Sequence, residues 1–361
     1  MKKFITLLFI AALFYGQFSF AQRSKKPIVL DFTKALKDER SFKLSEIADS
    51  VSYIKLETAE NCLINRAAVF VVDTLVIVKV SKPGQILVFN TEGKYLYPIG
   101  RSGQGPGEYG ALSEWAISPD GKYLAAQDFF RMCTHIFNLQ GEFITKIKSD
   151  VTMFDQFGFI DEHTLVRYTN QNAAAGGRYC FEYIDLATLE SSPFLWRYND
   201  EDHQKPGEIG LPTQIFIGEN ESYYSEVLND TLFTVAKSGQ ITPSYVYKIG
   251  KKVWPRPNLT REEREKYIHP IGLGAVGDYI FMNIIAAKGK SRTLVFEKSS
   301  KEFFAVKPHQ SCLYRDGTTT GLQNDLDGMQ TFTFLRTAYD NNWASLLSIP
   351  DTKAYQEKGC W

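Results

Sequence analysis

The stretch GRSGQGPGEYG, residues 100–110, combines five glycines with side chains that can bind a ligand. Glycines permit positive φ and a close backbone approach to a bound group, and exposed backbone amides can form a shallow anion-binding nest. A guanidinium, an amide, a carboxylate and a phenol lie between these glycines. The candidate ligand-binding residues are therefore Arg101, Gln104, Glu108 and Tyr109.

Residues 105–110 also match G-x-G-x-x-G, a pattern that cradles a pyrophosphate in dinucleotide-binding domains. That chemistry requires a helix directly after the last glycine, within a β-α-β unit. Residues 111–121 instead predict a strand and a turn, and Pro106 removes a backbone donor. The context therefore argues against nucleotide binding. Two interpretations stay open: a ligand-binding loop, or a structural corner, which is favoured because KPGE at 205–208 echoes GPGE within the loop.

The sequence contains no motif for nucleophilic catalysis or for metal binding. It lacks G-x-S-x-G and H-E-x-x-H, and its five histidines lie far apart. The five cysteines are scattered without a C-x-x-C pair, which argues against a zinc site and a disulfide scaffold. Residues 324–328 look like the start of a calcium loop but lack the later ligands, so they predict a turn. We expect no catalytic residue, metal ligand or cofactor from these motifs.

The charge balance is even, with 41 Lys plus Arg and 41 Asp plus Glu. Proteins that bind nucleic acid or anionic membranes usually carry a basic excess or a basic run. We therefore expect no nucleic-acid partner.

A strand–turn–strand unit recurs along the chain. Residues 86–96 and 134–144 share an apolar strand, the pair Phe-Asn, a turn with glycine and an aromatic strand. Similar units occupy residues 183–190, 232–241 and 294–303. Each unit predicts a β-hairpin, and in all of them except residues 183–190 a glycine or serine supplies the tight turn.

Two more strand-like runs precede each hairpin, as in residues 67–72 and 75–80. Four short strands in roughly 40 to 50 residues are typical of a β-propeller blade. We predict an all-β fold: a six-bladed β-propeller with four-stranded antiparallel blades. The blades are expected near residues 64–100, 112–148, 151–196, 211–249, 271–307 and 322–349.

A propeller must join its last blade to its first, because an open sheet edge is unfavourable. Residues 50–57, SVSYIKLE, form a lone strand-like run with no partner in their own unit. We predict that this run is the outer strand of blade six and closes a single domain of residues 22–361.

The first residues are typical of an export signal. A basic start, an apolar run over residues 4–15 and small residues at Ser19 and Ala21 predict a secretory signal peptide over residues 1–21. No cysteine follows the expected cleavage point, so we expect no lipoprotein anchor. No later stretch approaches the roughly 20 apolar residues of a membrane span. The expected location is the periplasm or the cell surface.

Several motifs together resemble a known family. The chain is similar to the secreted six-bladed β-propellers of Gram-negative gut-type bacteria, distant relatives of NHL-repeat propellers. The resemblance implies fold and export, since most members have no assigned activity. The motifs that carry it are Leu56-Glu57-Thr58, Phe89-Asn90-x-x-Gly93, the loop from Gly100 to Tyr109, and Asn229-Asp230-Thr231-Leu232.

A scaffold without a recognisable catalytic set favours a binding module. We expect it to present its axial face to a glycan, a peptide or an envelope protein. The alternative is a metal-assisted hydrolase or lyase, lactonase-like or glycan-cleaving, with an active site assembled from several blades at the axis. Charged residues that could line such an axial pocket are Asp128, Arg131, Arg167, Glu226 and Arg336.

Overall fold

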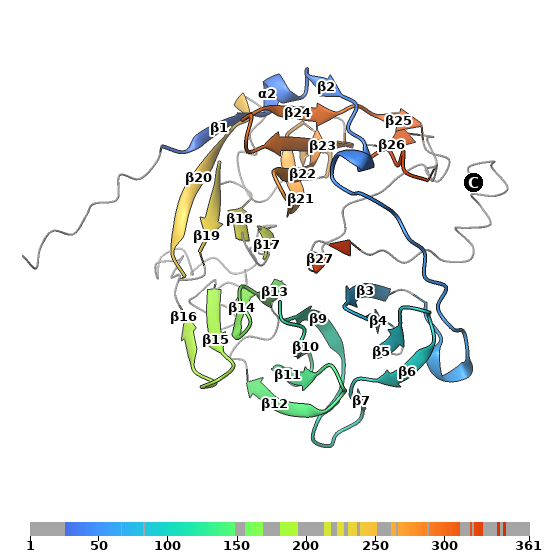
Figure 1. Ribbon diagram of the computed structural model, residues 1–361. Coiled ribbons are helices and arrows are strands. Elements are labelled where there is room, and N and C mark those ends of the chain that lie inside the picture. Colours follow the sequence, from blue (N-terminus) through green and yellow to red (C-terminus); the bar gives the residue numbers. More distant parts are fainter. Residues whose placement is uncertain are drawn as a thin grey trace, which may run out of the picture.

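The computed structural model is an all-β, propeller-like ring of sheets (Figure 1). Five sheets contain four consecutive antiparallel strands each, which confirms the predicted blade architecture. The structure describes residues 26–65, 67–81, 84–148, 156–168, 181–193, 213–217, 222–226, 230–236, 239–250, 261–264, 266–286, 289–310, 318–319, 321–327, 338–339 and 342–343.

The strands follow one another along the chain within each blade. Blade I contains β3 (Ala67–Val72), β4 (Leu75–Val80), β5 (Gln85–Asn90) and β6 (Tyr95–Pro98). Blade II contains β9 (Leu112–Ile117), β10 (Tyr123–Asp128), β11 (Cys133–Asn138) and β12 (Phe143–Lys148). Blade III contains β13 (Gln156–Phe159), β14 (Thr164–Tyr168), β15 (Phe181–Asp185) and β16 (Ser191–Pro193). Blade IV contains β17 (Thr213–Phe216), β18 (Ser222–Glu226), β19 (Thr231–Val235) and β20 (Ile241–Lys248). Blade V contains β21 (His269–Val276), β22 (Tyr279–Ala286), β23 (Lys290–Glu297) and β24 (Phe303–Val306).

The part of the chain that the structure describes forms five such blades, not the six that were predicted. The range expected for a sixth blade, 322–349, is described only at 322–327, 338–339 and 342–343. Two of those segments form a hairpin of β27 (Ala338–Tyr339) and β28 (Asn342–Trp343), which lies against β3. The repeat pattern counts hairpin-like units, but it does not show whether each unit pairs into four strands.

The recurring Phe-Asn pair builds the outer hairpin of a blade. In blade II, Phe137 is fully buried while the next residue, Asn138, begins the turn. The side-chain oxygen of Asn138 accepts a hydrogen bond from the backbone amide of Glu142 at 2.8 Å. The backbone amide of Asn138 donates to the backbone carbonyl of Glu142 at 3.0 Å. Gly141 completes the turn at φ +92°. Blade I repeats the arrangement around Asn90.

Apolar side chains fill the space between successive blades. Blades I and II share a buried cluster around Ile77, Trp115 and Phe137, and further clusters join blades II and III, III and IV, and IV and V. Each blade is therefore apolar on both faces, as expected of a sheet that packs between two neighbours.

Blades I and V each keep one apolar face that no other complete blade of the described chain covers. The N-terminal segment, residues 26–65, supplies cover and is called the strap here. Phe42 and Leu44 pack on blade V beside Leu322, while Leu56 and Cys62 pack on blade I. Fully burying a side chain of this size stabilises by about 1.5–3 kcal/mol.

The strap runs around the outside of the ring, from blade IV to blade I (Figure 1). Its first strand, β1 (Ile28–Asp31), adds to β20 as a parallel fifth strand, and β2 (Glu39–Arg40) adds to β24 in the same way. Between these two strands, helix α2 (Phe32–Ala35) places the ring of Phe32 5.0 Å from that of Tyr247.

After blade V the strap contacts residues 321–327. Lys43 forms a parallel bridge with Gln323, and the Ser45 amide and hydroxyl donate to Asp325 at 3.1 and 2.8 Å. The segment at 324–328, which resembles the start of a calcium loop in sequence, is therefore bound to the strap through Asp325. In this turn the Asn324 amide also donates to Asp327 at 2.7 Å.

The prediction that residues 50–57 form a closing strand is wrong, because the structure has no strand over these residues. They cross the outer hairpin of blade I instead. The Glu57 amide donates to the carbonyl of Gly93 at 2.7 Å, and its carboxylate accepts from the amide of Tyr95 at 3.0 Å. The N-terminal strands that do join sheets lie earlier in the chain, at Ile28–Asp31 and Glu39–Arg40.

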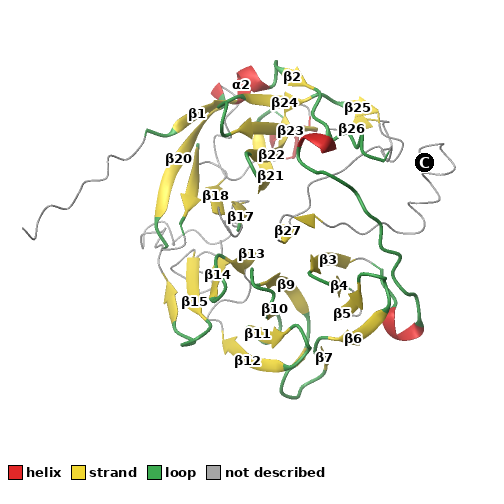
Figure 2. Ribbon diagram, in the orientation of Figure 1, coloured by secondary structure: helices red, strands yellow, loops and turns green. Residues whose placement is uncertain are grey.

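Helical elements are short and lie outside the sheets (Figure 2). Besides α2, the described residues contain two 3-10 turns, Leu44–Glu46 and Glu60–Cys62, and the short helix α3 (Arg261–Arg264). None of the described helices is long and apolar enough to cross a membrane. The remaining short strands are β7 (Arg101–Ser102), β8 (Glu108–Tyr109), β25 (His309–Gln310) and β26 (Thr318–Thr319).

Replacing Gly93 with alanine tests the strap crossing. A Cβ at Gly93 would lie 2.0 Å from the carbonyl oxygen of Lys55, whereas one at Gly84 meets nothing within 4 Å. Both glycines have positive φ, so both substitutions carry roughly 1–2 kcal/mol of backbone strain. We expect Gly93→Ala to lower the free energy of unfolding by a further ~1–3 kcal/mol through overpacking. Equal losses in chemical denaturation would show that the strap does not press on this turn.

Candidate functional site

The glycine loop connects the outer strand of blade I to the inner strand of blade II. Within it, β7 and β8 form a short parallel pair, Arg101 opposite Glu108 and Ser102 opposite Tyr109. In Figure 1, β7 and the following turn lie at the outer edge of the ring, beside β6 and β12. The loop reaches the inner strand only at its end, where Leu112 begins β9.

Two of the loop glycines are required by packing. Gly100 and Gly107 have φ values of +63° and +72°. A Cβ at Gly100 would lie 2.7 Å from the Tyr109 ring, and a Cβ at Gly107 would lie 2.7 Å from Cβ of Phe143, the first residue of β12. The loop therefore packs tightly against the flank of blade II, as the structural-corner interpretation requires.

Glu108 organises the tip of the loop. Its carboxylate accepts from the Gly105 amide at 2.7 Å and from Nε of Arg101 at 2.6 Å. These donors, first the Gly105 amide and then the Arg101 guanidinium, lower the pKa of Glu108. The Glu108 side chain is 18% exposed while that of Arg101 is 80% exposed, so the pair lies at the surface.

Tyr109 belongs to the core. It is 1% exposed, packs in the cluster between blades I and II, and donates its hydroxyl to the carbonyl of Ile99 at 3.3 Å. Burial raises the pKa of Tyr109 to about 12. Of the four predicted ligand-binding residues, Arg101 and Gln104 are the ones whose side chains are mainly exposed.

Asp128 and Arg131 hold the loop in place from the β10–β11 turn. Asp128 is fully buried and accepts from the amides of Gly110 at 2.6 Å and Ala111 at 3.3 Å. The Arg131 guanidinium donates to the carbonyls of Gly103 and Glu108. The sequence marked both residues as candidates for an axial pocket, but their contacts are with the loop.

A buried arginine joins blades II and III. Arg167 is fully buried, and its Nε donates to Glu182 at 2.8 Å while Nη1 donates to Thr134 of blade II at 3.2 Å. A guanidinium in this position is fixed by its partners rather than available to a ligand. The other candidates for an axial pocket, the Glu226 side chain and Arg336, lie outside what the structure describes.

The sequence motifs missed one cluster under the loop. His135 Nε2 lies 3.6 Å from Sγ of Cys133 and 3.6 Å from Oδ2 of Asp128, and all three side chains are buried. The signal was C-x-H on a strand, since residues two apart point to the same side of a sheet. The Nδ1 atom of His135 has no hydrogen-bond partner among the described residues.

This cluster is not arranged as a nucleophile and base. Burial raises the pKa of the Cys133 thiol, and the nearby Asp128 raises it further. Burial lowers the pKa of His135, with Asp128 acting in the opposite direction. Reactive cysteines need the reverse, a thiolate beside an imidazolium, and a triad needs its acid and thiol on different ring nitrogens.

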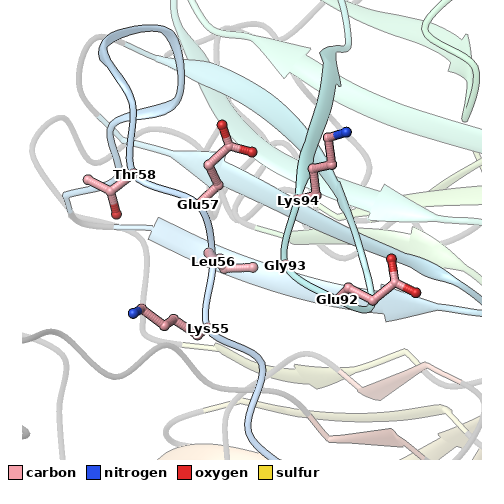
Figure 3. Close-up of a pocket in the computed structure, with 7 residues that line it drawn as sticks. All are labelled: Lys55, Leu56, Glu57, Thr58, Glu92, Gly93 and Lys94. Atoms are coloured by element: carbon pink, nitrogen blue, oxygen red, sulfur yellow. The ribbon is translucent and has the colours of Figure 1, made fainter.

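A shallow, open pocket of 490 Å³ lies where the strap crosses blade I (Figure 3). The close-up shows the lysine and glutamate side chains spread over the crossing rather than converging on one point. Within the described ranges, no group of three or more His, Cys, Asp and Glu side chains is placed to hold a metal ion. The residues that line the pocket are Lys55, Leu56, Glu57, Thr58, Glu92, Gly93 and Lys94.

Several other features singled out in the sequence lie outside the described residues. The KPGE stretch at 205–208 and residues 1–21 lie outside the described residues, as do Cys180, Cys312 and Cys360. Cys62 and Cys133, which are described, are buried free thiols.

The blades and their loop define an all-β, propeller-like protein, and comparisons with known proteins agree with this class. The chain belongs to the family described as Domain of unknown function (DUF4934), which matches residues 27–359. No curated protein matches the sequence.

Two solved structures are similar to this chain over at least two thirds of its length. An exported protein of Bacteroides fragilis NCTC 9343 is similar with a TM-score of 0.55 and 16% identity, over 78% of this chain and 80% of that chain. A member of the DUF4221 family from Bacteroides vulgatus ATCC 8482 gives a TM-score of 0.46 and 14% identity, over 67% of this chain and 80% of that one.

Replacing Arg131 with alanine tests how the loop is held. The variant loses two donors to loop carbonyls, and we expect about 1–3 kcal/mol lower stability and faster hydrogen exchange over residues 100–110. Arg101→Ala is the matched control, because an exposed ion pair contributes about 0–1 kcal/mol. If the two variants lose the same stability in denaturant, Arg131 does not anchor the loop.

The Glu108 carboxyl gives the loop a pH dependence. Its pKa is lowered in the folded protein, so its contribution is present above the ordinary value of 4.5 and is lost as the pH falls through the folded value. We expect protection of the Gly105 amide in hydrogen exchange to fall below pH 4.5 and to be weak at every pH in Glu108→Gln. An unchanged Gly105 amide in that variant would contradict the assignment.

Proposed function

We propose that this protein is an exported binding module that presents the glycine-loop surface to a glycan, a peptide or a partner protein. The observation that supports it most is that some residues hold the loop rigid while others expose their side chains to solvent. Glu108, Tyr109, Asp128 and Arg131 fix its conformation, while the side chain of Arg101 stays 80% exposed. Function often resides on loops that a rigid scaffold positions.

The position of this surface differs from the sequence-based expectation of an axial site. The loop tip lies at the outer edge of the ring (Figure 1), so we propose binding on the flank between blades I and II. A guanidinium and a primary amide on a fixed backbone suit ligands rich in hydroxyl, carbonyl or carboxylate oxygens.

We propose that a sixth blade completes the ring between blades V and I. This proposal is supported by the positions of the described segments of residues 321–343. Residues 321–323 follow blade V and pair with the strap, and the β27–β28 hairpin lies against β3, the inner strand of blade I.

Export to the periplasm or the cell surface is part of the proposal. It is supported by the signal-like residues 1–21 and by the description of a similar structure as an exported protein.

The alternative of a metal-assisted hydrolase or lyase makes a different prediction. It requires a stoichiometric metal ion and turnover, so elemental analysis together with assays on esters, lactones and oligosaccharides separates the two functions. Stoichiometric calcium or zinc with turnover would replace the binding hypothesis.

A double substitution tests the loop surface. We expect Arg101→Ala combined with Gln104→Ala to reduce binding to a glycan array or a peptide library by about tenfold or more. The first substitution removes charge-assisted hydrogen bonds to the ligand, and the second removes amide hydrogen bonds. The melting temperature should stay nearly unchanged, since both side chains are exposed. The control is Lys307→Ala, an exposed cation after blade V. Binding that survives the double substitution, or a large loss of stability, would refute a ligand role for this loop.

A further inference from the structure

The outer edges of the blades are not equally covered. β1 covers the edge of blade IV, β2 covers part of the edge of blade V, and the strap crosses the outer hairpin of blade I. In blade II, β12 pairs with β11 on one side and with no described strand on the other. At six residues it is the longest outer strand left open in this way.

The chain itself shows what such an edge accepts. β1 adds to β20 in parallel over four register positions, from Ile28 opposite Tyr245 to Asp31 opposite Lys248. An ion pair between Asp31 and Lys248 at 2.8 Å ends this addition. A fifth strand on the outer edge of a blade, held by backbone hydrogen bonds and an acid–lysine pair, is therefore compatible with this fold.

The side chains of β12 favour one kind of partner. Exposed and half-buried residues alternate along it, and the exposed ones are Ile144 at 48%, Lys146 and Lys148. Neither lysine forms an ion pair with a described residue, and the carboxylate of Glu142, just before β12, accepts a hydrogen bond from the Asn138 side chain at 2.7 Å. One apolar position is thus followed, on the same side of the sheet, by two cations that have no ion-pair partner among the described residues.

The charge of β12 also argues against a second copy of the same strand as the partner of its open edge. Two β12 strands side by side would bring lysines together, and edge lysines are a known protection against such pairing. An acidic strand has the opposite effect, because unlike charges in directly opposed cross-strand positions stabilise a sheet.

We infer that β12 is a docking edge for an extended acidic segment of another protein, which adds to blade II as a parallel fifth strand. The segment would place an apolar residue beside Ile144 and Asp or Glu beside Lys146 and Lys148. Backbone hydrogen bonds supply affinity and alternate side chains supply selectivity, as in other strand-addition complexes. This inference goes beyond the proposed loop surface and does not depend on it.

A designed peptide tests the edge. The probe is a capped, fluorescent heptapeptide with valine and two glutamates at alternate positions and threonine between them. We expect binding by anisotropy at low ionic strength, weakening with salt, and slower hydrogen exchange over residues 143–148. Lys146→Glu with Lys148→Glu should weaken binding about tenfold or more, since two attractions become repulsions. A peptide carrying lysine in place of glutamate should prefer this variant.

The controls separate the edge from the loop. Lys307→Ala and Arg101→Ala with Gln104→Ala should bind the acidic peptide like the unmodified protein. Because the substituted lysines are exposed, melting temperatures should agree within a few degrees. No binding at about 1 mM peptide, or binding that charge reversal leaves unchanged, would overturn the inference. So would a monomer–dimer equilibrium abolished by the reversal in sedimentation, which would assign the edge to a second copy.

Discussion

Burial of the two apolar faces of each blade is the constraint on which the rest of this structure depends. Within the ring, each face packs on its neighbour, and aromatic side chains such as Trp115 and Phe137 fill the space between sheets. The free faces of blades I and V receive residues from the strap, among them Leu56 and Phe42. One N-terminal segment thus contributes both to sheet edges and to the cores of blades V and I, which lie far apart along the chain.

Charged side chains complete this scaffold between blades. Arg167 bridges blades II and III, and Asp128 and Arg131 bind the loop between blades I and II. A buried charge is tolerated only when its hydrogen bonds are satisfied, so these side chains fix geometry and leave little freedom to serve a ligand. The exposed Arg101 and the open edge of β12 contrast with them, because neither is needed to hold the described fold together.

The two surfaces proposed for binding lie on the same flank of blade II. The loop packs against Phe143, where β12 begins, so a partner on the edge and a ligand on the loop would be neighbours. They rely on different chemistry, hydrogen bonds from fixed side chains in one case and strand addition in the other. The buried cluster of Cys133 and His135 beneath them contributes packing rather than reactivity, because burial raises the pKa of the Cys133 thiol and lowers the pKa of His135.

The sequence by itself determined the features that depend on neighbours along the chain. The hairpins at Asn90 and Asn138 and the four-strand blades followed from turn residues and from alternation within about 50 residues. Tertiary structure alone decided what residues 50–57 contact, that Tyr109 is core, and that Asp128 serves the loop. These three features depend on which distant segments meet in the fold. The sequence of a strand-like run does not identify the segment it contacts, and the sequence around a polar side chain does not show whether that side chain is buried. The same holds for the strap, whose earlier residues pair with blades IV and V while its later residues cross blade I without joining a sheet.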